Sequence, residues 1–92
     1  MNKTYFNNSN GNIYEIMKRY FDKVMLLKSK EGNYIVTRWD DIKKGSPVIN
    51  HYWGNNKQGA VNDFFNIAYE EYKNNHVLEK QITIEEFKEF YK

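Results

Sequence analysis

The residues best suited to catalysis or metal binding are two histidines, His51 and His76, in a chain that has no cysteine. Neither histidine has a second His or any Cys at the spacing that binds zinc. A proton-transfer role for His51 would need a carboxylate neighbour, for which Asp40 or Asp41 is the expected candidate. The simpler interpretation places His51 in a half-buried strand and His76 near a helix C-terminus, where it interacts favourably with the helix dipole.

Other arrangements that carry chemistry are weak in this sequence. The three serines occur without a G-x-S-x-G elbow, and the five glycines are scattered without a phosphate-cradling motif. Asp63 followed by Glu71 and Lys73 imitates a nuclease D…E-x-K pattern, but these residues fall on an expected helix whose apolar face needs Tyr72. We interpret that match as chance. The sequence therefore predicts no enzyme, no cofactor and no metal site.

Length and composition indicate one small domain. The chain has 92 residues and a net charge of +2, and no apolar run approaches the roughly 18 residues of a membrane span. No signal-peptide pattern opens the sequence. We therefore expect a cytoplasmic protein that does not enter a membrane. Aromatic residues make up 17% of the chain, more than a small core needs, which favours a binding surface because Tyr and Trp suit half-exposed contacts.

The periodicity predicts an α+β fold. Residues 1–12 are rich in Asn and lack periodicity, so we expect a flexible tail followed by a single domain over residues 13–92. Gly32 can supply the positive φ of a hairpin, and the loop from Asp40 to Pro47 interrupts the extended pattern. These features predict a four-stranded antiparallel meander over residues 14–20, 24–29, 34–39 and 48–53, although residues 14–21 also tolerate a helical interpretation.

Two helices are expected after the sheet. From Gln58 to Asn74 the apolar residues recur with a period of 3.6, over an arc about twice as wide as one sheet face requires. The excess apolar surface must be covered, either by a partner or by a short C-terminal helix. Thr83 and Glu86 have the spacing of a capping box, which predicts the start of that second helix.

Charge divides unevenly along the chain. Residues 1–57 hold 10 basic and 5 acidic side chains, whereas residues 58–92 hold 4 and 7. The expected sheet interleaves aromatic side chains with Lys18, Arg19, Lys28 and Arg38, as in domains that hold single-stranded nucleic acid. The small net charge opposes strong phosphate binding, so we keep a nucleic-acid-binding regulator as the alternative function.

A pattern of strands and turns extends over about residues 13–70. It consists of Tyr14-Glu15-Ile16, residues 22–29, residues 33–37, His51-Tyr52-Trp53-Gly54, Ala60 and Phe64. The pattern resembles small uncharacterised accessory proteins of phages and mobile elements in Firmicutes, in which a meander of the type KVLL…eYVVa…W/Y-G precedes a helix. The present chain departs from them in a longer loop at residues 40–47, an Asn-rich insertion at residues 55–57 and an added C-terminal helix.

Domains of this kind are similar to inhibitors of bacterial defence systems, including anti-CRISPR proteins. The resemblance implies a non-catalytic protein that occupies a site on a bacterial defence protein or ribonucleoprotein complex. A compact domain achieves this through a standard interface anchored by a few aromatic and Arg side chains. The candidate anchors are Arg38, Trp39, Tyr52, Trp53 and Tyr69, for each of which core packing is the alternative role. A homodimer formed through a strand edge or the wide helix face is a third hypothesis.

Overall fold

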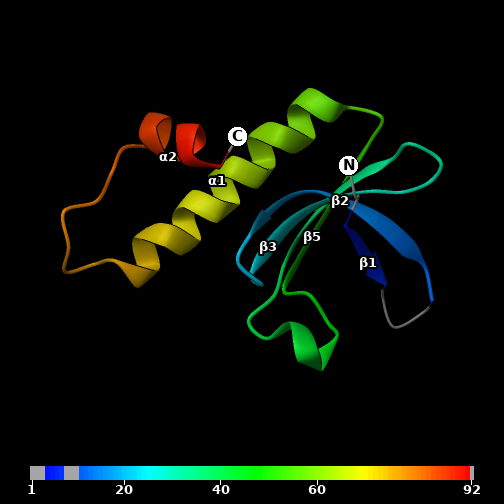
Figure 1. Ribbon diagram of the computed structural model, residues 1–92, viewed down its shortest axis with the longest axis horizontal. Coiled ribbons are helices and arrows are strands. Elements are labelled where there is room, and N and C mark those ends of the chain that lie inside the picture. Colours follow the sequence, from blue (N-terminus) through cyan, green and yellow to red (C-terminus); the bar gives the residue numbers. More distant parts are fainter. Residues whose placement is uncertain (1–3, 8–10, 92) are drawn as a thin grey trace.

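The computed structural model describes residues 4–7 and 11–91. In chain order, five strands precede two helices, and a short 3₁₀ turn lies in the connection between the last two strands (Figure 1). The elements are β1 (Tyr5–Asn7), β2 (Ile13–Tyr20), β3 (Val24–Lys28), β4 (Tyr34–Arg38), η1 (Ile42–Lys44), β5 (Ile49–Gly54), α1 (Lys57–Asn75) and α2 (Ile84–Phe90).

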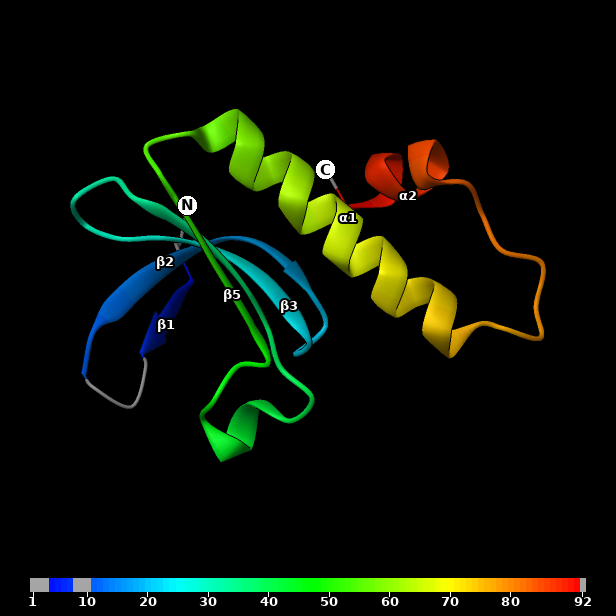
Figure 2. The ribbon, with the colours of Figure 1, turned by 180° about the vertical axis from the view of Figure 1, so that it is seen from behind.

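The strands form an antiparallel meander in the order β1-β2-β3-β4-β5. Short turns explain this order, because each strand reaches its sequence neighbour before any other partner. The β3–β4 hairpin turns at Gly32, whose φ of 88° is the positive value that the sequence predicts there. Residues 14–20 are confirmed as strand, with a register shift between Ile16 and Lys18 in the pairing with β3. Figure 2 shows β5 leading directly into α1.

The expectation of four strands is wrong, because Tyr5–Asn7 adds a fifth strand within the segment interpreted as a tail. Three residues between Asn-rich flanks are too few to show a period of two. Pairing with β2 supplies the stability that the sequence pattern lacks, with Phe6 opposite Tyr14, and the ring of Phe6 packs 5.2 Å from that of Trp39. The rest of the predicted tail includes residues 1–3 and 8–10, which lie outside the described residues.

Both helices lie on one side of the sheet, where α1 covers the strands and α2 packs against α1 (Figure 1). Asn56 caps α1 by accepting from the Gly59 amide, and Thr83 and Glu86 form the predicted capping box of α2. Phe87 of α2 is fully buried and packs into the same cluster as Phe64 of α1 and Leu26 of β3. The second helix therefore covers the excess apolar surface of the first, as one of the two sequence interpretations expects.

The sheet has two unequal faces. We call the side under α1 the helix face; its buried cluster includes Tyr20, Leu26, Val36, Phe64 and Phe87. We call the opposite side the open face; it has a smaller buried cluster of four residues, Met25, Leu27, Ile35 and Trp39, flanked by partly buried Phe6, Tyr14, Ile16 and Ile42. Because side chains alternate along a strand, consecutive residues of β4 serve different faces.

Candidate binding site on the open sheet face

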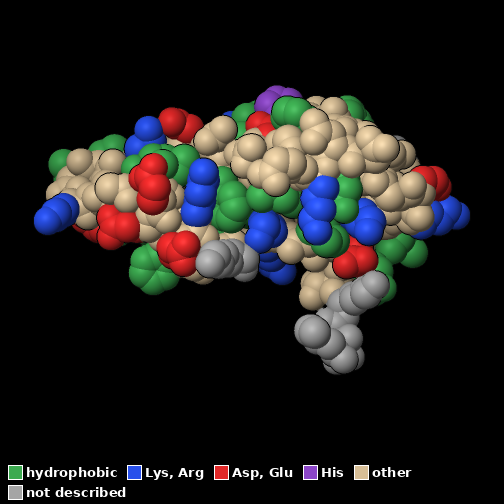
Figure 3. Space-filling model, turned by 90° about the horizontal axis from the view of Figure 1, so that it is seen from above, with side chains coloured by type: hydrophobic (Ala, Val, Ile, Leu, Met, Phe, Trp, Pro, Cys, Tyr) green, Lys and Arg blue, Asp and Glu red, His purple; other side chains and the backbone are tan. Residues whose placement is uncertain are grey.

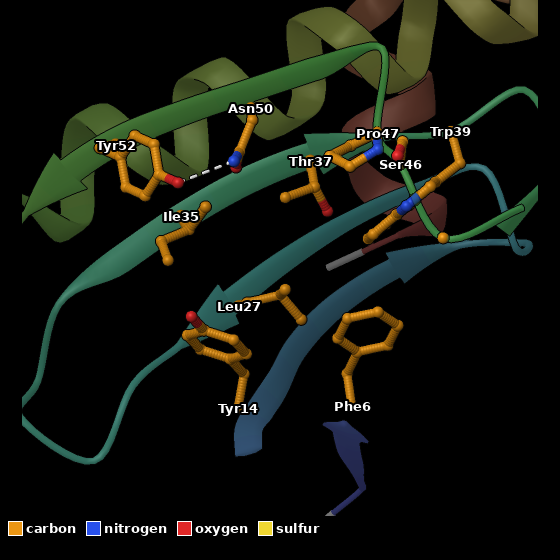
Figure 4. A pocket seen from close by; sticks show the side chains of 11 residues that line it. Phe6, Tyr14, Leu27, Ile35, Thr37, Trp39, Ser46, Pro47, Asn50 and Tyr52 are labelled. Atoms are coloured by element: carbon orange, nitrogen blue, oxygen red, sulfur yellow. Dashed lines mark hydrogen bonds between the residues drawn. The ribbon is translucent and has the colours of Figure 1, made fainter. Parts of the chain in front are cut away.

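A hollow of about 280 Å³ lies on the open face, where no helix covers the sheet. Side chains from all five strands line it, together with the segment that joins η1 to β5 (Figure 4). Its apolar walls come from Phe6, Tyr14, Leu27, Ile35, Trp39 and Tyr52. Four of the eleven lining residues are aromatic. Ligand pockets are concave and combine apolar walls with a few polar groups, and most are somewhat larger, about 300 to 1,000 Å³.

Tyr52 is the most exposed of these aromatic side chains. It is 72% exposed, and its hydroxyl accepts a hydrogen bond from Asn50 Nδ2 at 2.8 Å. Figure 4 shows Tyr14 from β2 and Tyr52 from β5 on either side of Ile35. The hydrogen bond from Asn50 restrains the Tyr52 side chain. Ordering this ring on binding therefore costs less side-chain conformational entropy than ordering an unrestrained ring.

Two polar atoms that border the hollow are buried without a hydrogen-bond partner in the described part of the chain. They are Oγ1 of Thr37 and Nε1 of Trp39, which belong to residues 4% and 2% exposed. An unsatisfied buried donor or acceptor costs about 1 to 3 kcal/mol, so native structures rarely keep one without a reason. Thr37 and Trp39 are therefore the two described residues whose buried polar side-chain atoms have no hydrogen-bond partner, and both line the hollow.

The hollow continues along the sheet toward the β3–β4 hairpin. A second hollow of about 380 Å³ shares Tyr14, Ile35 and Tyr52 with the first and extends to Ser29, Glu31 and Asn33. We call the two together the groove. Among the described residues that line it, Glu31 carries the one formal charge. The groove is therefore neutral at the Trp39 end and acidic at the hairpin end.

On the helix face, by contrast, polar side chains of β5 and α1 are hydrogen-bonded to each other. Asp63 of α1, 15% exposed, accepts hydrogen bonds from Trp53 Nε1 and pairs with His51 Nδ1, each at 2.8 Å. The carboxylate neighbour of His51 is thus Asp63 and not Asp40 or Asp41, because residue 51 points toward α1. The sequence offered no spacing that links these two residues, since they come from different elements.

The surroundings of the His51–Asp63 pair can be stated for the described residues. Of the two serines among them, Ser29 accepts a hydrogen bond from the Asn33 amide and Ser46 lines the hollow on the open face, and His51 is about half exposed. The shared carboxylate joins β5 to the first turns of α1, so its evident role is structural. Within the described residues, no group of three His, Asp or Glu side chains is placed to hold a metal ion.

The five predicted anchors do not form one surface. Trp39 and Tyr52 both line the hollow on the open face, although Trp39 is almost fully buried. Trp53 and Tyr69 pack against the helix-face cluster, where the Tyr69 hydroxyl donates to the carbonyl of Ile82 at 2.9 Å. For Trp53 and Tyr69 the core-packing alternative matches their surroundings, and Trp39 combines core packing with a place in the hollow.

The fifth predicted anchor, Arg38, also faces the helices. Its guanidinium lies 3.1 Å from Asp40 and 3.6 Å from Glu71 of α1, and its side chain is 25% exposed. The sequence missed Phe6, Tyr14, Thr37 and Asn50 as members of the site. Because side chains alternate between the two faces of a strand, Thr37 and Asn50 could have been grouped with Tyr52 from the sequence. The hollow itself depends on the three-dimensional shape of the sheet, which the alternation does not specify.

Charged side chains are distributed unevenly over the surface of the molecule. Viewed from the helix side, Asp and Glu side chains gather toward the end that carries α2, and Lys and Arg side chains cross the middle (Figure 3). Burial raises the pKa of the Tyr20 hydroxyl in the helix-face cluster, and Tyr91 and Glu71 add to the shift. The Glu70 carboxylate raises the pKa of Lys73. Both effects lie on the helical side of the protein, away from the hollow.

Comparisons with protein-family models, with curated proteins and with solved structures find no match to this chain. Among the described helices, none is both long enough and apolar enough to cross a membrane. A function for the open face must therefore be argued from the chemistry of its own residues.

Proposed function

We propose that this protein is a non-catalytic inhibitor that binds a bacterial defence complex through the open face of its sheet. The observation that carries the proposal is the aromatic hollow, with Tyr52 exposed at its edge and two unpartnered polar atoms in its wall. Hot spots of protein interfaces are enriched in Trp, Tyr and Arg, and exposed Tyr52 with its aromatic neighbours supplies side chains of this kind on the open face. The defence target and the phage origin come from the resemblance of the meander sequence to phage accessory proteins.

Inhibition by occupancy suits a chain of this size. A standard interface needs about 800 Å² from each partner, and the total exposed surface of this protein is 6448 Å². Contact through the open face requires neither helix to unfold, because α1 and α2 pack on the other side of the sheet. No chemistry by the inhibitor is required.

The nucleic-acid alternative finds less support in the arrangement of charge. Lys18 lies over the Phe65 ring and Lys28 over the Tyr34 ring, so these cations accompany helix-face residues, as does Arg38. No Lys or Arg lines the groove within the described residues. Single-strand binding needs cations beside the stacking rings. Arg19, which pairs with open-face Met25 between β2 and β3, does not line the groove, and its guanidinium bonds to the Phe21 carbonyl and the Asp22 carboxylate.

A phage-plating experiment tests the proposal. Low-GC hosts that each carry one CRISPR or restriction system are infected with a phage which that system targets, with and without expression of this protein. We expect plaque formation to recover in one such host and to stay unchanged in the matched host that lacks the system. Recovery in no host, at confirmed expression of folded protein, would contradict the proposal.

A pull-down then identifies the target in the responsive host. Tagged protein is incubated with lysate treated with nuclease, and we expect it to retain a protein component of the same defence system. Retention that disappears when nucleic acid is destroyed would favour the nucleic-acid alternative, whose own signature is an affinity for single strands that falls steeply between about 50 and 200 mM salt.

A further inference from the structure

Strand β5 forms one edge of the sheet. It pairs with β4 along one side, its helix-face side chains bond to Asp63 of α1, and no described strand pairs with its other side. The opposite edge of the sheet, β1, has three residues, whereas β5 has six. Because very short edge strands offer little to another chain, β5 is the edge at which further pairing can occur.

The backbone groups of β5 point alternately toward β4 and away from it. The Arg38 carbonyl accepts a hydrogen bond from the Val48 amide, and Arg38 lies opposite Ile49 in the register of the two strands. The N–H and C=O groups of one residue share a direction that alternates along an antiparallel strand, so Asn50 and Tyr52 direct theirs away from β4. Both residues are exposed. The outer edge therefore offers their backbone groups to a second strand.

The middle of β5 lacks the features that usually protect a sheet edge. Native proteins prevent pairing at exposed edges with Lys, Pro, inward-pointing charges or bulges. From Ser46 to Asn56 the chain has no Lys, Arg, Asp or Glu, and Pro47 precedes the strand. The register shift in the pairing with β4 falls after Tyr52. Nothing within the strand from Asn50 to Tyr52 therefore opposes pairing.

A second copy of β5 matches this edge in backbone and side chains. An antiparallel register centred on His51 places Asn50 of each copy opposite Tyr52 of the other. Both residues direct their backbone groups outward, so each of these pairs can exchange two hydrogen bonds. Their side chains already bond within one strand, where Asn50 Nδ2 donates to the Tyr52 hydroxyl at 2.8 Å. Residues opposite each other on one face of a sheet lie within the same reach.

The lack of charge favours a second copy over an unrelated strand. Like charges directly opposite each other destabilise a sheet, and β5 brings none to a pairing with itself. A strand of another protein would gain the backbone bonds, but this edge carries no Lys, Arg, Asp or Glu that selects it.

We infer that two copies of this protein associate by antiparallel pairing of β5 with β5, across a two-fold axis at His51. The axis is perpendicular to the sheet, so the open faces of the two copies lie on the same side of one continuous sheet. Each copy then contributes its exposed Tyr52 to a shared surface. The inference goes beyond the proposed function and does not depend on it.

Sedimentation equilibrium tests the association. Pairing of one short strand buries a small area, so we expect a reversible dimer with a Kd of about 0.1 mM, measured between about 10 µM and 1 mM protein. Asn50→Lys adds a charge of the kind that protects natural edges and should weaken the dimer about tenfold or more. Asn62→Lys makes the same charge change at an exposed position of α1 and is the matched control, which should dimerise like the wild type.

Cysteine cross-linking tests the register, because the chain has no cysteine of its own. In His51→Cys the two sulfurs face each other across the axis, where the Cα atoms of a non-hydrogen-bonded pair are about 4.5 Å apart and a disulfide fits. In Asn50→Cys the same register separates the two equivalent Cα atoms by about 8 Å, too far for a disulfide. We expect oxidation to cross-link His51→Cys at least about tenfold faster than Asn50→Cys. Circular dichroism checks that both variants are folded.

Three results would overturn the inference: a monomer at every concentration, a dimer that Asn50→Lys leaves intact, or equal cross-linking of the two cysteine variants. Neither measurement uses plaque recovery, so a monomer that restores plaques would remove the β5 pairing and retain the inhibitor. A dimer with the expected cross-link but without plaque recovery would support the β5 pairing and contradict the defence role.

Discussion

The two faces of the five-stranded sheet differ in how their polar side chains are hydrogen-bonded. On the helix face, several partly buried polar side chains have partners: Asp63 bonds to both His51 and Trp53, and Tyr69 and Tyr72 each bond to the backbone of Ile82. On the open face, Thr37 Oγ1 and Trp39 Nε1 have none among the described residues. The strands that build the two faces are the same, so backbone pairing does not explain the difference.

This difference in hydrogen bonding indicates which face stabilises the fold and which face is available for binding. A face that is covered by helices is selected for complete packing and complete hydrogen bonding, which together hold the fold. A face that keeps aromatic rings exposed and polar atoms unpaired breaks those rules, and real proteins break them mainly at functional sites. We therefore expect substitutions on the helix face to lower stability and substitutions on the open face to lower binding.

The largest effect on stability is expected for Phe87→Ala. The ring is fully buried and contacts Tyr20, Tyr69, Tyr72 and Tyr91, so its removal leaves a cavity between the helices. Losses of about 3 to 5 kcal/mol accompany such truncations. Urea unfolding measures the change, and a loss below about 1 kcal/mol would show that α2 is not needed to complete the helix-face core.

A smaller loss, about 1 to 3 kcal/mol, is expected for Asp63→Ala, because Trp53 Nε1 is then left without its acceptor. The neighbouring Asn62→Ala serves as the control and should stay within about 0.5 kcal/mol, since residue 62 is exposed. Equal unfolding free energies for the two variants would mean that the link between β5 and α1 contributes nothing.

Thr37→Val should act in the opposite direction. The substitution removes an unpaired buried hydroxyl and keeps the branched shape, so we expect the free energy of unfolding to rise by about 1 kcal/mol. A destabilised Thr37→Val protein would indicate that the hydroxyl is satisfied in solution, and the contrast between the faces would weaken.

A pH titration sharpens the comparison on the helix face. The pKa of Tyr20 is raised in the folded protein, above the ordinary value of 10.0 that the unfolded chain has. Its contribution to stability is therefore complete below about pH 10 and is lost as the pH rises through the folded pKa. We expect unfolding free energy to fall more steeply above pH 10 in the wild type than in Tyr20→Phe, and parallel curves would contradict the assignment.

Local patterns in the sequence predicted most of the fold. The period-two runs located four strands, and the spacing of Thr83 and Glu86 located α2 through its capping box, because both signals depend on neighbours within a few residues. Strand β1 was not predicted. Its three residues are held in place by pairing with β2 and by the contact between Phe6 and Trp39, both of which join residues far apart in the sequence. Such long-range contacts leave no periodic trace.

The site was harder to predict than the fold. Alternation along β4 and β5 assigns adjacent residues to opposite faces, yet the predicted anchors included both Trp53, which faces α1, and Tyr52, which faces the groove. Surplus aromatic content indicated that a binding surface exists without showing which rings the helices would cover. The unpaired atoms of Thr37 and Trp39 become visible only when the burial of every neighbour is known.

The most direct test of the two-face account compares Tyr52→Ala with Phe90→Ala. The two rings are similarly exposed, 72% and 75%, but Tyr52 borders the groove and Phe90 lies on α2. Plaque recovery and unfolding free energy are measured for both variants in the host that responds to the wild type. The account predicts that both proteins remain within about 0.5 kcal/mol of wild-type stability and that only Tyr52→Ala loses plaque recovery. Full recovery with Tyr52→Ala, or equal loss with Phe90→Ala, would contradict the assignment of binding to the open face.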